Sequence, residues 1–182
     1  MFTSPRVTAV ALLAVSLSPL AATAALAEHH EGKVSAAVID TSGASVGRVD
    51  LEQTPSGVLI KADVTGLAPG AHGFHIHETG TCDPGDGFKS AGGHFAPGAS
   101  QHGLMVEGGP HGGDMPNQTV GADGHLQTQV LNTGVTLMAG ENSIHDGDGS
   151  ALVIHEGADD YTSQPSGAAG SRVACAVLSA PK

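Results

Sequence analysis

The chain has 182 residues, a formal net charge of −11 and only 3% aromatic residues. This length supports one domain with a hydrophobic core rather than two. The acidic balance argues against nucleic acid and anionic lipid surfaces as partners, because both carry negative charge and attract basic proteins.

The first 27 residues have the pattern of a secretory signal peptide. Arg6 precedes an apolar run, and residues 25–27 form a small-x-small sequence of the kind that signal peptidase cuts. A membrane anchor that stays attached is the alternative, but a proline interrupts the run. We therefore expect a signal peptide at residues 1–27, a polar tail at 28–32 and one exported domain at 33–182, with no membrane segment after cleavage.

From Lys33 onward the sequence predicts strands and no helix. The predicted strands are short, rich in β-branched residues and partly alternating, and turn residues separate them. They cover residues 33–40, 46–53, 57–67, 72–78, 125–132, 135–140, 150–156 and 172–179. This pattern and the 27 glycines suit a small antiparallel sandwich or barrel filled by aliphatic side chains.

Two long stretches without a strand pattern interrupt this series, from about residue 79 to 119 and from about residue 157 to 171. Loops of this length are usually functional, disordered or held in place by something. The first stretch contains His94, His102 and His111, whose side chains could hold it.

Cys82 and Cys175 are the only cysteines in the chain. An even pair of cysteines in an exported protein predicts one disulfide, and two unlinked buried thiols are the alternative. The bond would close a long loop and so restrict the unfolded chain.

The segment GFHIHETG contains a first candidate metal site. Side chains alternate between the two faces of a strand, so Phe74 and Ile76 can enter the core while His75 and His77 project together on the other side. Two residues of rise separate the two imidazoles by roughly 6–7 Å, which lets both reach one ion. His155, at the end of another apolar segment, is a third candidate ligand.

A second candidate metal site is the series His94, His102, His111 and Asp114 in the first long stretch. Three nitrogen ligands and one carboxylate match the closed tetrahedral shell of a structural zinc ion. Such an ion would hold this glycine-rich loop in place. The alternative is that these are solvated loop histidines.

Four motifs together resemble the secreted bacterial copper/zinc superoxide dismutases: GFHIHETG, the spacing of the second candidate site, VIHEGADD and AGSRVAC. The resemblance extends from about Lys33 to the end of the chain. It implies an all-β fold, an eight-stranded antiparallel Greek-key barrel or sandwich with two long functional loops. It also implies an enzyme that converts two superoxide anions and two protons into dioxygen and hydrogen peroxide, with one copper and one zinc ion per subunit.

The resemblance divides the candidate ligands into two sets that share one histidine. The copper set is His75, His77, His94 and His155. The zinc set is His94, His102, His111 and Asp114. His94 would bridge the two ions and carry a proton during the reaction.

The same resemblance implies roles for residues around the metals. Arg172 would lie beside the copper and hold the anionic substrate, and Asp159 would link a copper-side histidine to a zinc-side histidine. His72 would be structural. Cys82 and Cys175 would form the disulfide of the family.

The resemblance leaves several properties open. Bacterial relatives occur as dimers and as monomers, and we expect a homodimer. The periplasm is the expected location, with full secretion as the alternative. An exported copper/zinc storage or delivery protein without catalysis would use the same histidines, but it would need neither Arg172 nor Asp159. A copper-only dismutase would lack the zinc set.

Two polar features have no assigned role in the resemblance. The second long stretch contains no lysine, so Lys89 in the first is a candidate for attracting superoxide, a solvated loop charge being the alternative. His29 and His30 could collect metal, or they could simply belong to a polar terminus.

Overall fold

A computed structural model describes Met1, residues 28–30 and residues 32–179 of the chain. The signal peptide predicted for residues 1–27 therefore lies outside the described residues, apart from Met1. Among the helices of the described part, none combines the length and the hydrophobicity needed to span a membrane.

The described residues form short strands and two single helical turns. In chain order, the strands are β1 (Glu28–His30), β2 (Lys33–Asp40), β3 (Ser45–Thr54), β4 (Gly57–Val64), β5 (Gly70–His72), β6 (Phe74–His77), β7 (Gln118–Val120), β8 (Leu126–Asn132), β9 (Ser150–His155) and β10 (Arg172–Ser179). The 3-10 turns η1 (Pro84–Asp86) and η2 (Lys89–Ala91) lie in the loop that follows β6.

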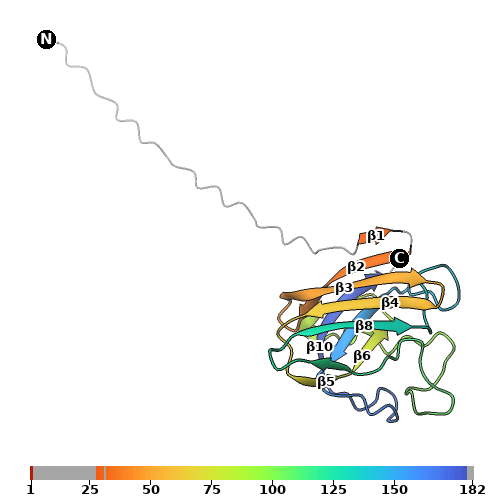
Figure 1. Ribbon diagram of the computed structural model, residues 1–182. Helices are drawn as coiled ribbons and strands as arrows, with labels where there is room; N and C mark the ends of the chain where they lie inside the picture. The colour runs from red at the N-terminus through yellow and green to blue at the C-terminus, as the bar shows by residue number, and fades with distance from the viewer. Residues whose placement is uncertain (2–27, 31, 180–182) are drawn as a thin grey trace.

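Most strands belong to one curled antiparallel sheet with the order β6-β9-β10-β2-β3-β4-β8, and β1 pairs with the start of β2. The chain crosses between the two ends of this sheet twice, from β4 to β6 and from β8 to β9 (Figure 1). These crossings and the pairing of β2, the first long strand, with β10, the last strand, give Greek-key connectivity. The all-β Greek-key class predicted from the sequence is thus confirmed.

The core lies on the concave side of the sheet. In β4, the side chains of Val58, Ile60, Ala62 and Val64 point inward and are buried, and the charged residues between them are exposed. This strict alternation is what a sheet with one solvated face requires. Phe74 joins the same core from β6.

Three local predictions differ from the structure. The strand predicted for residues 135–140 is wrong: Thr136 alone makes a bridge, to Ser143. Val135 and Leu137 are buried in the core from an irregular loop, so the alternating pattern arises there without strand pairing. The structure also has a strand before Lys33, because β1 lies within the expected polar tail.

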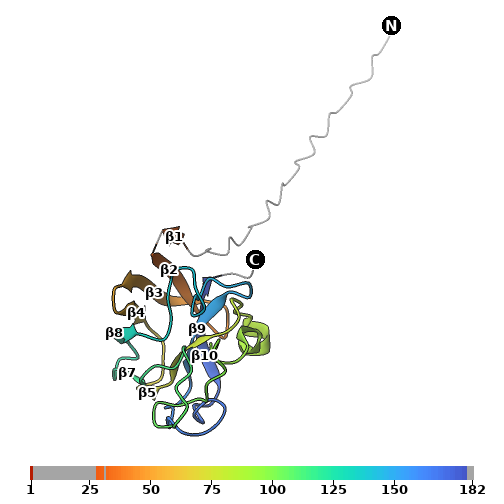
Figure 2. The same ribbon diagram turned by 90° about the vertical axis from the view of Figure 1, so that its right-hand side faces the viewer.

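The third difference concerns the strand predicted for residues 72–78, which is split at Gly73. β5 pairs with β7 in a separate two-stranded sheet, whereas β6 pairs with β9 in the main sheet. A Cβ atom at Gly73 would lie 3.0 Å from the side chains of His75 and Ala169, so a larger residue there would disturb both. The loops after β6 and after β9 gather at one end of the molecule (Figures 1 and 2).

Candidate metal centre

Strand β6 presents His75 and His77 on the face opposite the core. Both side chains have an exposed fraction of 0%, because the long loops cover this face. Phe74 and Ile76 alternate with them and pack into the core. The alternation predicted from the sequence is confirmed.

The first long loop runs along the edge of β6 that faces away from β9. The N–H of Ile76 donates to the carbonyl of Gly113, and the N–H of Phe95 donates to the carbonyl of Ile76, both at 2.9 Å. These bonds hold the loop against the strand. They bring the adjacent residues His94 and Asp114 beside the two histidines of β6, with which they form isolated bridges.

Two groups of candidate ligands result, and in each group the ligand atoms lie within 4.8 Å of one another. The four-histidine group is His75, His77, His94 and His155. The mixed group is His94, His102, His111 and Asp114. The ring of His94 belongs to both, with its centroid 4.1 Å from that of His75 and 5.1 Å from that of His102. The structure thus brings together the two sets named from the sequence.

Asp114 is the centre of the mixed group. Its Oδ1 lies 2.7 Å from Nδ1 of His94 and 3.1 Å from Nδ1 of His102. Its Oδ2 accepts from the N–H groups of Gly103 and His111. Burial alone would raise the pKa of Asp114, but the hydrogen bonds from His94 and Gly103 outweigh burial and hold this pKa well below its ordinary value. Asp114 is therefore an anion that can bind a cation.

Burial keeps three histidines of the four-histidine group neutral: His75, His77 and His155. Burial lowers the pKa of His75 and His77, and it lowers the pKa of His155 to about 3. The charge of Arg172 acts in the same direction on His77. Neutral imidazoles have a free lone pair, which is the form that binds metals.

The unpaired nitrogens of the site indicate that the two groups fit metal ions. Nδ1 of His75, Nε2 of His94 and Nδ1 of His111 are buried without a hydrogen-bond partner; the last lies 3.4 Å from Asp114 Oδ1 without hydrogen-bond geometry. Buried polar atoms without partners are unfavourable, and a bound cation would satisfy them. A mixed nitrogen and carboxylate set suits zinc, and an all-imidazole set suits copper.

Asp159 connects the two groups from the second long loop. Its Oδ2 accepts from Nε2 of His75 at 2.8 Å, and its Oδ1 accepts from Nε2 of His102 at 3.1 Å. Each ring thus keeps its Nδ1 for its own group. Asn117 clamps the main chain of Asp159, since its amide donates to the carbonyl and accepts from the N–H of that residue. Such outer hydrogen bonds fix the orientation of ligand rings.

We expect Asp159→Asn to weaken metal binding by about 10–100-fold, because the amide cannot accept from both rings as the carboxylate does. Titration of the metal-free protein with zinc and copper against a competing chelator measures this loss. Asp160→Asn is the matched control, because the Asp160 carboxylate bonds only to nearby loop residues such as Ser163. Equal affinities for Asp159→Asn and the parent protein would contradict the linking role.

The metal-free protein is expected to lose stability on acidification from about pH 7 to about pH 4. The pKa of His155 is about 3 in the folded protein and returns to its ordinary value near 6.5 on unfolding. Between these two pH values the unfolded chain binds more protons than the folded protein. The free energy of unfolding therefore decreases as the pH decreases. The contribution of the neutral, buried His155 to the free energy of unfolding is fully present above pH 6.5 and is lost towards pH 3. Urea unfolding at several pH values measures it, and His155→Gln should reduce the slope; an unchanged slope would refute the assignment.

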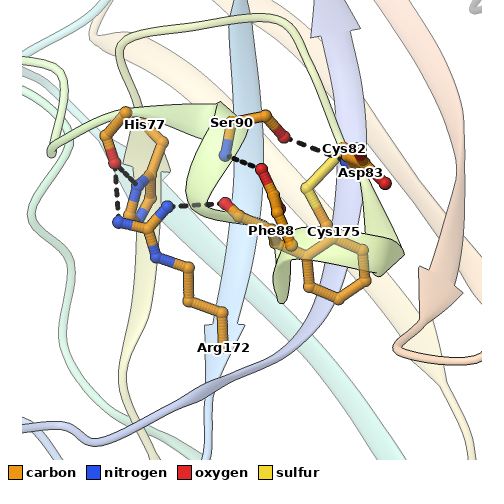
Figure 3. The surroundings of a disulfide bond; sticks show 9 residues. His77, Cys82, Asp83, Phe88, Ser90, Arg172 and Cys175 are labelled. Atoms are coloured by element: carbon orange, nitrogen blue, oxygen red, sulfur yellow. Dashed lines mark hydrogen bonds between the residues drawn. A yellow bond between two sulfur atoms is a disulfide. The ribbon is translucent and has the colours of Figure 1, made fainter.

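Arg172 begins β10, opposite His155 in the register of β9. Its Nη1 donates to the carbonyl of Phe88 and its Nη2 to the carbonyl of Gly92, both at 2.6 Å (Figure 3). Nδ1 of His77 donates to the same Gly92 carbonyl at 3.1 Å. The guanidinium group is therefore held beside the four-histidine group.

The remaining residues predicted for the site also lie around it. His72 is buried, and its ring nitrogens lie 2.6 Å from the carbonyl of His155 and 2.7 Å from that of Ala68, as a structural role would require. The predicted disulfide joins Cys82 to Cys175 and ties the first long loop to β10.

Sequence reasoning missed three residues that support the site: Phe88, Gly92 and Asn117. Phe88 had one visible signal, because it is a large apolar residue in the otherwise polar segment DPGDGFK. Gly92 acts through its main-chain carbonyl, which accepts from Arg172. Asn117 acts through its side chain, which bonds to the main chain of Asp159 in the second long loop. No local sequence pattern predicts such contacts.

Comparison with known proteins identifies the family. A sequence model described as copper/zinc superoxide dismutase (SODC) matches residues 45–178. The chain belongs to the copper/zinc superoxide dismutase family. A Cu-Zn superoxide dismutase of Aquifex aeolicus is 51% identical over 150 residues, which is 81% of this chain and 88% of the relative. A Cu-Zn superoxide dismutase of Caulobacter vibrioides is 41% identical over 75% of this chain and 79% of its own length.

Solved structures of copper/zinc superoxide dismutases and related proteins share the fold. The Cu/Zn superoxide dismutase from Brucella abortus has a TM-score of 0.66 and 32% identity, over 80% of this chain and 99% of that one. A superoxide dismutase-like protein from Bacillus subtilis has a TM-score of 0.76 and 38% identity, over 79% of this chain and 97% of that one. Copper and zinc are the metals that give the family its name, and both groups of ligands suit them.

Proposed function

We propose that this member of the copper/zinc superoxide dismutases binds copper at the four-histidine group and zinc at the mixed group. The overall reaction converts two superoxide anions and two protons into dioxygen and hydrogen peroxide. Copper supplies the one-electron reduction and oxidation that the two halves of this reaction require. Asp114 would be the anionic ligand of the zinc ion, and an ion bound there would hold the first long loop and the ring of His94 in place.

Two residues of the chain would act on the substrate. Arg172 would bind the negatively charged superoxide, and His94 would donate a proton. Arg172 is a fixed cation beside the four-histidine group, so it can hold a small anion there. His94 has Nδ1 on Asp114 and a free, buried Nε2. An imidazole can hold a proton at Nε2 and release it to the departing peroxide, because its pKa lies near neutral pH in solution.

The sharing of His94 by two buried ligand groups next to Arg172 is the observation that carries this proposal. A metal storage or delivery protein would need ligands but no tethered cation at the metal. The guanidinium group is held by two carbonyls at 2.6 Å, which favours catalysis over storage.

The decisive experiment measures superoxide decay with the mature protein loaded with copper and zinc. The same protein stripped of metal and an equal amount of free copper are the controls. Fast decay that depends on the loaded protein is expected. Decay no faster than that with free copper, at full metal occupancy, would support the storage or delivery function instead.

We also propose that the chain is exported to the periplasm after cleavage behind residue 27. The basic residue, apolar run and small-x-small site support export, and a disulfide is typical of an oxidising compartment. A homodimer is part of the same proposal. Mass spectrometry of the mature N-terminus and sedimentation of the purified protein test the two statements.

Lys89 is a candidate for attracting superoxide. It is exposed in η2 and makes no ion pair within the described residues, next to the carbonyl that holds Arg172. We expect Lys89→Glu to slow superoxide decay severalfold at low salt, and the difference to shrink as salt screens the charge. Lys61→Glu is the control, because it makes the same charge change on the outer face of β4. An unchanged rate of superoxide decay for Lys89→Glu at low salt would show that Lys89 does not attract the substrate.

A further inference from the structure

Phe88 has a conformation and an environment that are unusual for an aromatic residue. Its backbone is left-handed, with φ 61° and ψ 20°, a region that costs free energy for a large side chain. Its ring is fully buried at the disulfide between Cys82 and Cys175 (Figure 3), in a cluster that includes Val153 of β9. This packing compensates for the backbone strain and fixes the residue between η1 and η2.

The main chain of Phe88 is held on both sides. Its N–H donates to the carbonyl of Asp83 at 2.9 Å, and its carbonyl accepts from the N–H of Ala91 at 3.2 Å. The second lone pair of that carbonyl accepts from Nη1 of Arg172 at 2.6 Å. The position of the guanidinium group therefore depends on how firmly the Phe88 ring anchors its own peptide unit.

We propose that Phe88 is a positioning residue for Arg172. Its ring anchors the loop segment 83–92 against the disulfide and β9, and its carbonyl orients the guanidinium group toward the four-histidine group. The role rests on the proposed function, in which Arg172 holds the anionic substrate. Gly92 supplies the second carbonyl, and without the Phe88 anchor it would hold only one edge of the guanidinium group.

Chemical modification of arginine tests the positioning without any metal. Phenylglyoxal would be applied to the metal-free protein, and the rates at Arg172 and Arg48 would be followed by peptide mass spectrometry. Arg48 is an internal reference, because it is exposed on β3 and paired with Asp50. We expect Phe88→Ala to raise the rate at Arg172 about tenfold, as for the loss of one charge-assisted hydrogen bond, and to leave Arg48 unchanged.

Further variants separate positioning from general loss of stability. Ile144→Ala removes an equally buried side chain from the main core and should leave the rate at Arg172 unchanged. Phe88→Leu keeps an apolar anchor and should restore most of the protection. If Phe88→Ala does not fold, Phe88→Gly removes the ring and relieves the backbone strain, so the same tenfold increase is expected for it. Parent-like rates in the alanine or glycine variant, or an equal increase in Ile144→Ala, would overturn the proposal.

Azide binding to the copper- and zinc-loaded protein distinguishes this proposal from the function on which it rests. Azide is a small anion, and its titration can be followed by absorption. Weaker binding is expected in both Arg172→Ala and Phe88→Ala, with parent-like binding in Phe88→Leu. If Arg172→Ala binds azide like the parent, the proposed role of Arg172 is wrong. If only Phe88→Ala binds like the parent, that role stands and the positioning by Phe88 is wrong.

Discussion

Replacing His94 by alanine is expected to reduce superoxide decay to the level of free copper and to weaken the binding of both metals by at least about 100-fold. This loss of metal affinity is larger than the loss expected from removing an outer hydrogen bond, because a direct ligand is lost from both groups at once. Metal content after dialysis and the rate of superoxide decay measure the two effects. No other single replacement among the seven ligand residues removes a ligand from both groups.

His125→Ala is the matched control for this experiment. His125 is a partly exposed histidine on the outer side of the sheet, where its Nε2 pairs with Asp63. Its replacement should change neither metal content nor activity. If His94→Ala retains both metals and a parent-like rate, the two groups do not work as one centre and the proposed proton transfer at His94 is wrong.

Removing the disulfide by Cys82→Ala together with Cys175→Ala is expected to lower the free energy of unfolding by about 4–5 kcal/mol in the chain-entropy model. The bond spans 93 positions, so its loss greatly enlarges the conformational freedom of the unfolded chain. Urea unfolding of the metal-free protein measures the change. This loss is a large fraction of the stability of an ordinary domain.

The reduced parent protein tests the cause of this effect. Reduction of the parent should destabilise it to a similar extent, since it removes the same cross-link without removing side-chain volume. A double variant as stable as the oxidised parent would show that the cross-link does not limit the unfolded chain. A loss seen in the variant but absent on reduction would assign the effect to packing around the buried Cys175 instead.

The long strands, the histidine pair of β6 and the mixed group could be predicted from the sequence because their signals are local, whereas the place of His94 in the four-histidine group was implied by the resemblance to a family. Alternation in β4 and β6 follows directly from the two faces of a strand, and two histidines two residues apart then share a face. The same signal failed at residues 135–140, where Val135 and Leu137 reach the core from a loop. Alternation reports burial, and burial does not require a hydrogen-bonded partner strand.

The supporting contacts of the site could not be predicted because they join segments far apart in the chain. The bond from Arg172 to the Phe88 carbonyl spans 84 positions, and that from Asn117 to Asp159 spans 42. Both use main-chain groups, which are the same in every residue type. Resemblance to a family supplied the role of Arg172, but the residue that holds it became visible only in the folded loop.

Gly92 divides the loop between Cys82 and His94 into two parts with different tolerance for changes in length. Its backbone has φ 73°, and a Cβ atom there would lie 2.7 Å from Oε1 of Glu78. Its carbonyl serves both His77 and Arg172, so Gly92 must stay in register with β6. Insertions and deletions can therefore be absorbed before Gly92, provided that an anchor like Phe88 is kept. Between Gly92 and His94 even one added residue would move a ligand out of both groups.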